Sequence, residues 1–404
     1  MERVALKIQR RRYSRAAVYE VSIHHLLRRE TGGCPGVVAL REAFIHEGHI
    51  CMAFEKHGMS LEDALGRGPL TAKKTRGVTR QILQPLDAMH RCGYAHTDVK
   101  PDNILYDTRT GRAVLADLGS ADKDLGQGSS FGTREYTPPE VILGSPLGTA
   151  VDLWALGCTV CEMLTGRLLF SPRRAAAKKY REFSKDEDAV EIPLGEAAKA
   201  DLAAEEAEQF PRGAIVAGKY RLEKVLGQGG FGTVWRAAKL SDAPVDGRYA
   251  TLWEYAQGVQ RNSPTAAGAA GADDRDREWR KARGADDLLD LALNYEHVLA
   301  ILRLCGSPPD DMIRNARFRA SYFEADGAVR FRPKLRRIAL RTLLGRATNL
   351  GKAELALAAD FLGGLIAVNP GARLTARAAL DHPWLNPRRG GSRQRVSSTQ
   401  LANW

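Results

Sequence analysis

The stretch HTDVKPDN occupies residues 96–103. It brings together a carboxylate, Asp98, a cation, Lys100, and an amide, Asn103. Each residue alone is typical of a turn, because Asp, Pro and Asn cluster in turns anyway. Their combination is more informative, since a carboxylate, a cation and an amide two to five residues apart are groups that position a reactive oxygen and a metal-bound phosphate.

Two further motifs follow in a fixed order, DLG at 117–119 and PPE at 138–140. Phosphoryl transfer needs a carboxylate that accepts the proton of the attacking hydroxyl group, a cation beside the phosphate and oxygen ligands for Mg²⁺. Asp98 and Lys100 fit the first two needs, and Asp117 of DLG joins Asn103 as a candidate metal ligand. The three motifs together indicate phosphoryl transfer.

These ordered motifs resemble those of the protein kinase superfamily, over roughly 1–170 and 288–385. The resemblance implies an α+β, two-lobed kinase fold with a small β-rich lobe and a large helical lobe. It also implies a Ser/Thr protein kinase that uses ATP and Mg²⁺, acts on protein hydroxyl groups, and has Asp98 as catalytic base. The alternatives are a non-catalytic scaffold with the kinase fold or the product of a rearranged gene.

The resemblance assigns the lysine of VALK, Lys7, to the α- and β-phosphates of ATP. Glu20, thirteen residues later on an expected helix, matches the glutamate that pairs with this lysine in the active state. The alternative is that both are ordinary surface charges, whose pairing would contribute little to stability.

The expected adenine site lies on the run ICMAFEKHG at 50–58, which resembles the fifth strand and hinge of the family. The resemblance assigns Phe54 as the gatekeeper and the backbones of Glu55 and His57 to the adenine edge. Ala5 and Leu105 would lie on the two faces of the base, although both are equally suited to a plain apolar core.

Three residues match structural positions of the family. Glu140 of PPE and Arg373 of NPGARLT correspond to a buried ion pair beneath the activation segment. Asp152 of DLWALGC corresponds to the aspartate that holds the catalytic loop.

Within the superfamily, HTD with DLG and the run GMSLEDAL are most similar to the SR-protein kinases and their CMGC-group relatives. Lys100, two residues after Asp98, is the arrangement of Ser/Thr kinases. Thr97 replaces the usual arginine that binds an activation-loop phosphate, so we expect activity without that phosphate. Thr137 replaces an arginine of the CMGC group, which leaves the substrate sequence open.

The glycine-rich phosphate loop of the family is displaced, and the sequence order is therefore rearranged. Only six residues precede Lys7 in the sequence, whereas the pattern GxGxxGxV occurs at 227–234. The residues that match it, and that the resemblance assigns to ATP, are Gly227, Gly229, Gly232 and Val234. Three explanations remain: the loop folds back onto the small lobe, it is a relic of a rearranged or duplicated gene, or the gene sequence is assembled incorrectly.

If the loop folds back, residues 218–240 should pair as two antiparallel strands with the strand of Lys7, giving a five-stranded small lobe. An isolated two-stranded hairpin is barely stable in water, and the Lys7 strand alone would be an exposed apolar edge. Each element would cover the other.

The expected organisation follows from the motifs and the composition of the segments between them. It is a small lobe from the Lys strand onward (1–59), the first part of the large lobe (60–170), a linker (171–217), the displaced hairpin (218–250), a disordered linker (251–287), the last part of the large lobe (288–387) and a tail (388–404).

Composition sets the remaining expectations. With 44% apolar and 27% charged residues the chain is globular, and its net charge of +12 suggests acidic partners but no dedicated nucleic-acid binding. Six dispersed cysteines predict no disulfide and an intracellular protein of the cytoplasm, the nucleus or both. No stretch predicts a membrane span or a targeting segment. We expect a monomer.

Overall fold

The computed structural model describes residues 2–123, 125, 132–171, 210–229, 232–243, 284–330 and 335–387. These residues fall into two compact units. Unit 1 is built from residues 2–29, 38–57, 210–229 and 232–243, and unit 2 is built from the other described residues. Most of the expected linkers 171–217 and 251–287, and the tail 388–404, lie outside the described residues.

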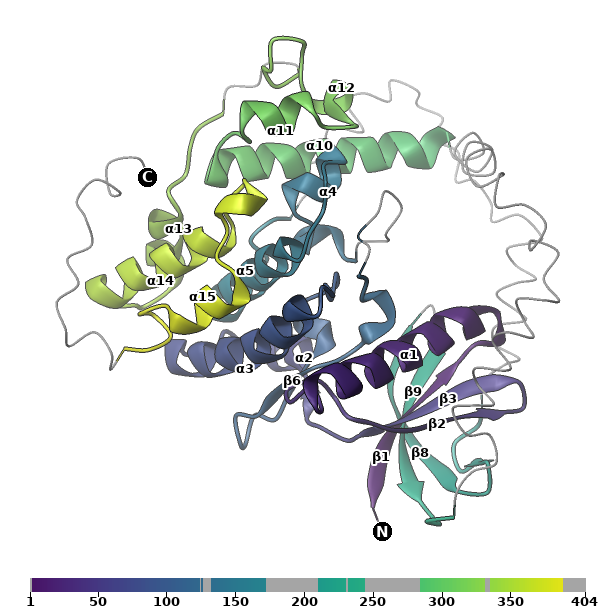
Figure 1. The fold of residues 1–404 in the computed structure, drawn as a ribbon. Helices are drawn as coiled ribbons and strands as arrows, with labels where there is room; N and C mark the ends of the chain where they lie inside the picture. The colour runs from purple at the N-terminus through teal and green to yellow at the C-terminus, as the bar shows by residue number, and fades with distance from the viewer. Residues whose placement is uncertain are drawn as a thin grey trace, which may run out of the picture. The chain divides into compact units, whose positions relative to one another are not determined.

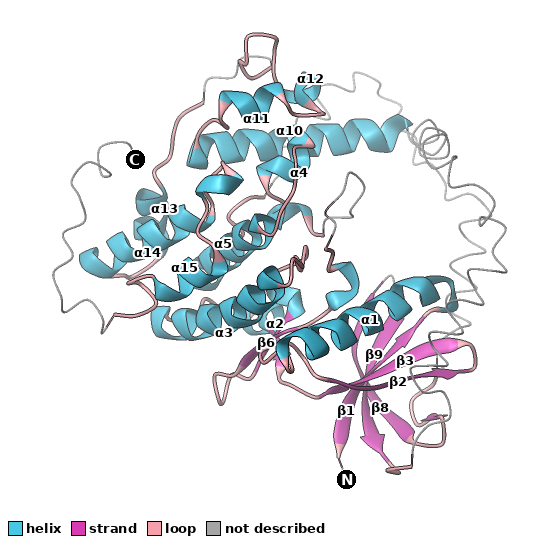
Figure 2. Cartoon of the chain, in the orientation of Figure 1, coloured by secondary structure: helices cyan, strands magenta, loops and turns pink. Residues whose placement is uncertain are grey.

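Unit 1 is a six-stranded antiparallel sheet with one long helix (Figure 2). The strands, in their order across the sheet, are β2 (Leu40–His46), β3 (His49–Glu55), β1 (Arg3–Gln9), β9 (Gly232–Lys239), β8 (Tyr220–Gly229) and β7 (Ile215–Val216). Figure 1 shows the purple N-terminal strand β1 beside the teal strand β9, although more than 220 residues separate them in the sequence.

The expected pairing of residues 218–240 with the Lys7 strand is present. In the antiparallel register, Lys7 lies opposite Val234 of β9 on one side and opposite Met52 of β3 on the other. The sheet has six strands instead of the expected five, because Ile215–Val216 pairs with the start of β8 and forms the additional strand β7.

Both faces of this sheet are covered. Alternation along β1 places Val4, Leu6 and Ile8 in an apolar cluster that Phe210 helps to cover. On the other face lies α1 (Ser14–Thr31), where His24 packs against Phe54 with 5.5 Å between ring centroids. The helix α1, on one face, precedes β2 in the sequence. Phe210, on the opposite face, precedes β7.

Unit 2 is largely helical, with a small three-stranded sheet. Its helices are α2 (Leu61–Leu65), α3 (Ala72–Arg91), α4 (Pro139–Leu143), α5 (Ala150–Thr165), α10 (Gly284–Cys305), α11 (Asp310–Arg314), α12 (Arg319–Tyr322), α13 (Leu340–Ala347), α14 (Lys352–Leu365) and α15 (Ala376–Asp381). The sheet has the order β4 (Met59–Ser60), β5 (Ile104–Tyr106), β6 (Ala113–Leu115).

The helix α5 forms the centre of unit 2, because nearly all of its residues are buried, including Trp154, Cys158 and Cys161. Burial raises the pKa of the Cys161 thiol to about 12, as expected for a packed cysteine. The helix α10 begins at Gly284, so residues 284–287 are helical and not part of a linker. Among the described residues, no helix combines the length and apolar character that crossing a membrane requires.

Candidate phosphotransfer site

Unit 1 contains the expected ion pair between Lys7 and Glu20. Lys7 Nζ lies 2.7 Å from Glu20 Oε2, and the glutamate side chain is only 3% exposed. The pair joins the centre of the sheet to α1, because Lys7 is on β1 and Glu20 is on the helix. This burial sets the pair apart from an ordinary surface pair, whose contribution is small.

The glycine-rich motif forms the turn end of the β8–β9 hairpin. Gly229 lies opposite Gly232, Gly227 lies opposite Val234, and residues 230–231 fall outside the described residues. A Cβ atom on Gly232 would lie 2.3 Å from the carbonyl oxygen of Ile8, so β1 and β9 can approach only because this residue is glycine. A Cβ atom on Gly227 would meet no described atom within 4 Å.

The expected adenine-binding residues of unit 1 lie on neighbouring strands. Ala5 of β1 lies opposite Phe54 of β3, and Glu55 ends that strand. The Glu55 N–H donates a hydrogen bond to the Ala39 carbonyl oxygen, whereas the His57 carbonyl oxygen accepts one from Lys56. Leu105 belongs to unit 2, where it pairs with Ser60 and Val114.

Unit 2 brings together the three groups of the HTDVKPDN stretch. Lys100 Nζ lies 2.8 Å from Asp98 Oδ2, and Asn103 Nδ2 donates a 2.8 Å hydrogen bond to the same oxygen. Asn103 Nδ2 also donates to the Asp98 carbonyl oxygen. The amide oxygen of Asn103 therefore points away from Asp98 and is the atom that can bind a metal ion.

The expected anchor of this loop is also present. Asp152, which is fully buried on α5, accepts 2.8 Å hydrogen bonds from the backbone N–H groups of His96 and Thr97 and from His90 Nε2. Burial alone would raise the Asp152 pKa, but the hydrogen bonds and positive charge of the histidines lower it. Thr97 has φ = 66°, which is unusual for a β-branched residue, and the two bonds to Asp152 help to hold that conformation.

Asp117 is held close to the HTDVKPDN loop through the backbone. The Ala116 N–H donates a 2.8 Å hydrogen bond to the Asn103 carbonyl oxygen, and His96 Nε2 donates to the Ala116 carbonyl oxygen. Asp117 itself has φ = 62°, and the following Leu118 is buried. Asp117 is exposed and directly follows Ala116, the residue that is hydrogen-bonded to Asn103.

The structure adds Gly132 and Thr133, whose contact with the HTDVKPDN loop no sequence motif predicted. Lys100 Nζ donates a 2.7 Å hydrogen bond to Thr133 Oγ1, and the Thr133 N–H donates to Asp98 Oδ1 at 3.3 Å. A Cβ atom on Gly132 would lie 1.8 Å from Asp98 Oδ1. The signal available in the sequence was the glycine directly before a threonine, a few residues ahead of PPE.

Ser129, Ser130 and Thr133 are hydroxyl residues of the segment between DLG and PPE. The Thr133 hydroxyl group accepts a hydrogen bond from Lys100 in the structure. Ser129 and Ser130 lie outside the described residues.

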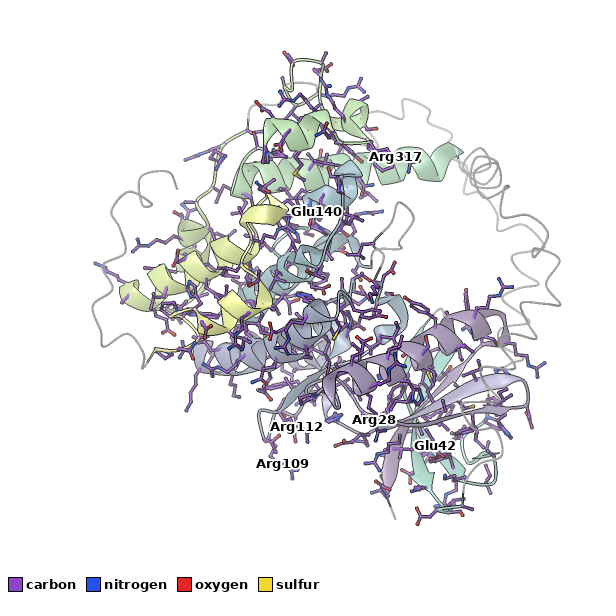
Figure 3. The ribbon with its side chains drawn as sticks, viewed as in Figure 1. Arg28, Glu42, Arg109, Arg112, Glu140 and Arg317 are labelled. Carbon is purple, nitrogen blue, oxygen red and sulfur yellow. The ribbon has the colours of Figure 1, made fainter. Side chains whose placement is uncertain are left out.

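The buried ion pair expected between Glu140 and Arg373 is present in unit 2 (Figure 3 labels Glu140). Arg373 Nη2 donates a 2.6 Å hydrogen bond to Glu140 Oε2, and both side chains are almost fully buried. Arg373 also donates to the carbonyl oxygens of Ala367 and Ala150, and its guanidinium group lies 5.0 Å from the centre of the Trp154 ring. The pair links α4, α5 and the segment before α15.

A second buried polar contact, also missed, lies close to the same segment. The Tyr136 hydroxyl group donates a 2.6 Å hydrogen bond to Glu162 Oε2 on α5. Burial raises the Glu162 pKa to about 7, with smaller contributions from the negative charges of Glu62, Asp102 and Glu135. The hydrogen bond from Tyr136 opposes this increase.

The antiparallel sheet with its Lys–Glu pair, the Asp–Lys–Asn loop and the buried Glu–Arg pair together define a protein kinase. The protein kinase domain family matches residues 2–215, which is more than half of the chain. The chain belongs to this family.

Similar proteins agree with this assignment. The chain is 35% identical to dual specificity tyrosine-phosphorylation-regulated kinase 3 of Homo sapiens over 176 residues, 41% of this chain and 30% of that protein. It is 35% identical to serine/threonine-protein kinase prp4 of Schizosaccharomyces pombe over 161 residues, 38% of this chain and 34% of that protein. These relatives confirm the expected similarity to CMGC-group kinases. The chain spans about a third of the length of the curated relatives it matches.

Proposed function

We propose that the chain is a Ser/Thr protein kinase that transfers the γ-phosphoryl group of ATP to hydroxyl groups of proteins. The observation that carries the proposal is the contact of Asp98 with Lys100, Asn103 and Thr133 in one loop cluster. A carboxylate held by three such neighbours has a fixed direction, which positioning a nucleophile requires.

In this proposal Asp98 accepts the proton of the substrate hydroxyl group as that oxygen attacks. Lys100 places its positive charge beside Asp98 and Thr133, where negative charge on a transferring phosphoryl group would be stabilised. Asn103 fixes the Asp98 carboxylate through Oδ2, so the other oxygen, Oδ1, is left to face Thr133 and the substrate. The segment between the DLG and PPE motifs, here called the activation segment, thus contacts the proposed base directly through Thr133.

The residues present fit MgATP, which would supply the phosphoryl group and its charge-neutralising cation. Among the described residues, no three His, Cys, Asp or Glu side chains are grouped to hold a metal ion by themselves. Asn103 and Asp117 offer one amide and one carboxylate oxygen, which matches a Mg²⁺ ion whose remaining ligands are phosphate oxygens and water. Lys7, oriented by Glu20, is the cation of unit 1 that would bind the phosphates.

We also propose that the displaced glycine-rich loop is used. The seven paired positions of β1 and β9 support this, because they fix Val234 opposite Lys7. In this proposal the glycine-rich strands follow Lys7 in the sequence instead of preceding it. They still lie beside the Lys7 strand in the sheet.

The test is Asp98→Asn, with Asp107→Asn in the exposed turn after β5 as the matched control. Loss of the base should lower radiolabel transfer from ATP by about 10²- to 10⁴-fold. The control should retain wild-type transfer. Peptides that carry Ser, Thr or Tyr as the single hydroxyl residue should be compared, and only Ser and Thr peptides should be labelled.

A chain that binds MgATP in a thermal-shift assay but labels none of these peptides would contradict the proposal. That result would favour a kinase-fold scaffold. Equal transfer by Asp98→Asn and wild type would instead contradict the role of Asp98.

A further inference from the structure

The run of residues 303–346 carries much of the positive charge of the chain. It contains ten arginines and one lysine against four acidic residues, a net charge of +7, whereas the whole chain of 404 residues carries +12. None of these side chains belongs to the candidate phosphotransfer site. A local excess of one sign of charge attracts partners of the opposite sign, so this run is a candidate interaction surface.

Part of the charge is used inside the run itself. Arg319 donates hydrogen bonds to the carbonyl oxygens of Glu324 and Ala325. Arg330 Nε lies 3.8 Å from Glu324 Oε1, and Arg330 also donates to the Ala320 carbonyl oxygen. These two arginines therefore stabilise the turn that follows α12.

Another part of the run lies at the end of α10. The Ile338 N–H donates a 2.9 Å hydrogen bond to the Arg303 carbonyl oxygen, which joins the segment before α13 to that helix. Arg337 lies over the residue that follows α10, because a Cβ atom on Gly306 would be 2.7 Å from Arg337 Nη1. Two separate stretches of the sequence therefore meet at one place on unit 2.

The arginine surface is the name used here for the four arginines and one isoleucine at this place: Arg303, Arg336, Arg337, Ile338 and Arg341. All four arginines are exposed, and Ile338 is 45% exposed. Within the part of the chain that the structure describes, none of the four arginine side chains forms an ion pair with a carboxylate. This separates them from Arg319 and Arg330, whose charges are used within the fold.

The chemistry of the arginine surface fits carboxylate groups beside an apolar group. A guanidinium group presents a planar set of N–H donors that matches the two oxygens of a carboxylate. Ile338 lies among the arginines and offers an apolar contact. None of the five residues is aromatic, so the surface lacks the stacking platform that proteins use to bind single-stranded nucleic acids.

We propose that the arginine surface binds an acidic segment of a partner protein, in which Asp and Glu residues flank an apolar residue. The carboxylates pair with the four arginines, and the apolar side chain of the partner covers Ile338. Because these pairs are exposed, salt should weaken the binding. The proposal does not depend on kinase activity.

The probe is a fluorescein-labelled peptide of sequence EEDLLEDE, and binding to the full-length protein is measured by fluorescence anisotropy. We expect binding at low salt, and at least about tenfold weaker binding when the salt concentration is raised to about 0.5 M. The uncharged peptide QQNLLQNQ should not bind. A peptide with serine in place of both leucines should bind several-fold more weakly, because its contact with Ile338 is lost.

Two double variants with the same net charge locate the binding. Arg303→Glu combined with Arg337→Glu reverses two charges of the arginine surface and should weaken binding by about tenfold or more. The control combines Arg109→Glu, in the exposed turn after β5, with Arg377→Glu on the exposed face of α15, and should change binding by less than about twofold. Figure 3 labels Arg109.

A second measurement places the peptide on the surface directly. A photoreactive benzoylphenylalanine replaces the first leucine of the probe, and mass spectrometry identifies the protein residues that it labels. We expect labelling within 303–341. If circular dichroism shows that the Arg303 and Arg337 double variant is unfolded, Arg336→Glu combined with Arg341→Glu takes its place with the same expected loss.

Equal loss of binding in the surface variant and the control variant would overturn the proposal, because the attraction would then follow the total charge. Labelling outside 303–341 or equal binding of the leucine and serine peptides would also overturn it. So would tighter binding of an oligouridylate with the same number of negative charges. Failure of the wild-type chain to bind the acidic peptide at low salt would overturn it outright.

Discussion

At the residue scale, two glycines of one motif have different physical requirements. Gly232 lies against the backbone of Ile8, where a Cβ atom would be only 2.3 Å from the carbonyl oxygen. Gly227 has space for a methyl group among the described residues. Gly232 is therefore needed for strand packing whether or not a phosphate is bound, whereas Gly227 is not.

We expect Gly232→Ala to lower the free energy of unfolding of unit 1 by about 1–3 kcal/mol, because β1 and β9 must move apart. Gly227→Ala is the matched control and should change it by less than about 0.5 kcal/mol. Urea unfolding followed by tryptophan fluorescence, with Trp235 in unit 1, is the measurement. Equal stability of the two variants would contradict this account of Gly232.

Also at the residue scale, the buried carboxyl group of Glu162 links stability to pH. Its pKa is raised from 4.5 to about 7, chiefly by burial, so between these values the folded state holds a proton that the unfolded state has lost. The group therefore favours folding most at or below pH 4.5, and this advantage is lost as the pH rises to about 7.

Glu162→Gln should remove this contribution. We expect the difference in unfolding free energy between wild type and variant to change by up to about 3 kcal/mol between pH 4.5 and 7, in the direction that disfavours wild type at the higher pH. Urea titrations at several pH values provide the measurement. A difference that stays constant with pH would show that Glu162 titrates normally.

At the scale of elements, α5 organises unit 2. Asp152 near its start holds the HTDVKPDN loop, Trp154 packs under Arg373, and Glu162 near its end binds Tyr136. One buried helix thus fixes the loop that carries Asp98 and the segment that contacts it. The Arg373–Glu140 pair joins this helix to α4.

Arg373→Met should cost about 3–5 kcal/mol of unfolding free energy, because it leaves the buried Glu140 carboxylate without its charge partner. Arg76→Met is the control, since the Arg76–Glu354 pair is partly exposed and should contribute less than about 1 kcal/mol. Chemical unfolding of both variants decides the comparison. Similar losses in the two would show that burial of the Glu140 pair has no special importance.

At the scale of the whole molecule, sequence order and spatial order differ within unit 1. The N-terminal strand β1 lies between β3 and β9, so distant parts of the chain must meet before this sheet is complete. Unit 2 is also assembled from separate stretches, since α10 to α15 follow β9 in the sequence. Each unit therefore depends on contacts between residues far apart along the chain.

Activity of the whole protein should not require phosphorylation of the activation segment. Thr97 offers no positive charge to a phosphate, and its hydroxyl group donates a hydrogen bond to the Ser120 carbonyl oxygen instead. Phosphatase treatment of the purified protein should leave peptide phosphorylation unchanged relative to a mock-treated sample. Loss of activity that returns on rephosphorylation would contradict this prediction.

The sequence alone was sufficient for features that depend on short, ordered motifs. The Lys7–Glu20, Asp152 and Glu140–Arg373 contacts were expected because their motifs resemble those of protein kinases, and the structure contains all three. The pairing of the hairpin with the Lys7 strand followed from the need of each to cover its apolar surface. In these cases, a resemblance to a known motif, or an apolar surface that needs cover, identifies the partner.

Only the tertiary structure decided the contacts that no sequence motif predicts. Strand β7, the approach of Thr133 to Asp98 and the Tyr136–Glu162 pair depend on how separate segments pack, as does the close contact between Gly232 and Ile8. A threonine, a glutamate or two apolar residues are compatible with many surroundings. Their roles are fixed because a closely packed interior places specific atoms within bonding distance of them.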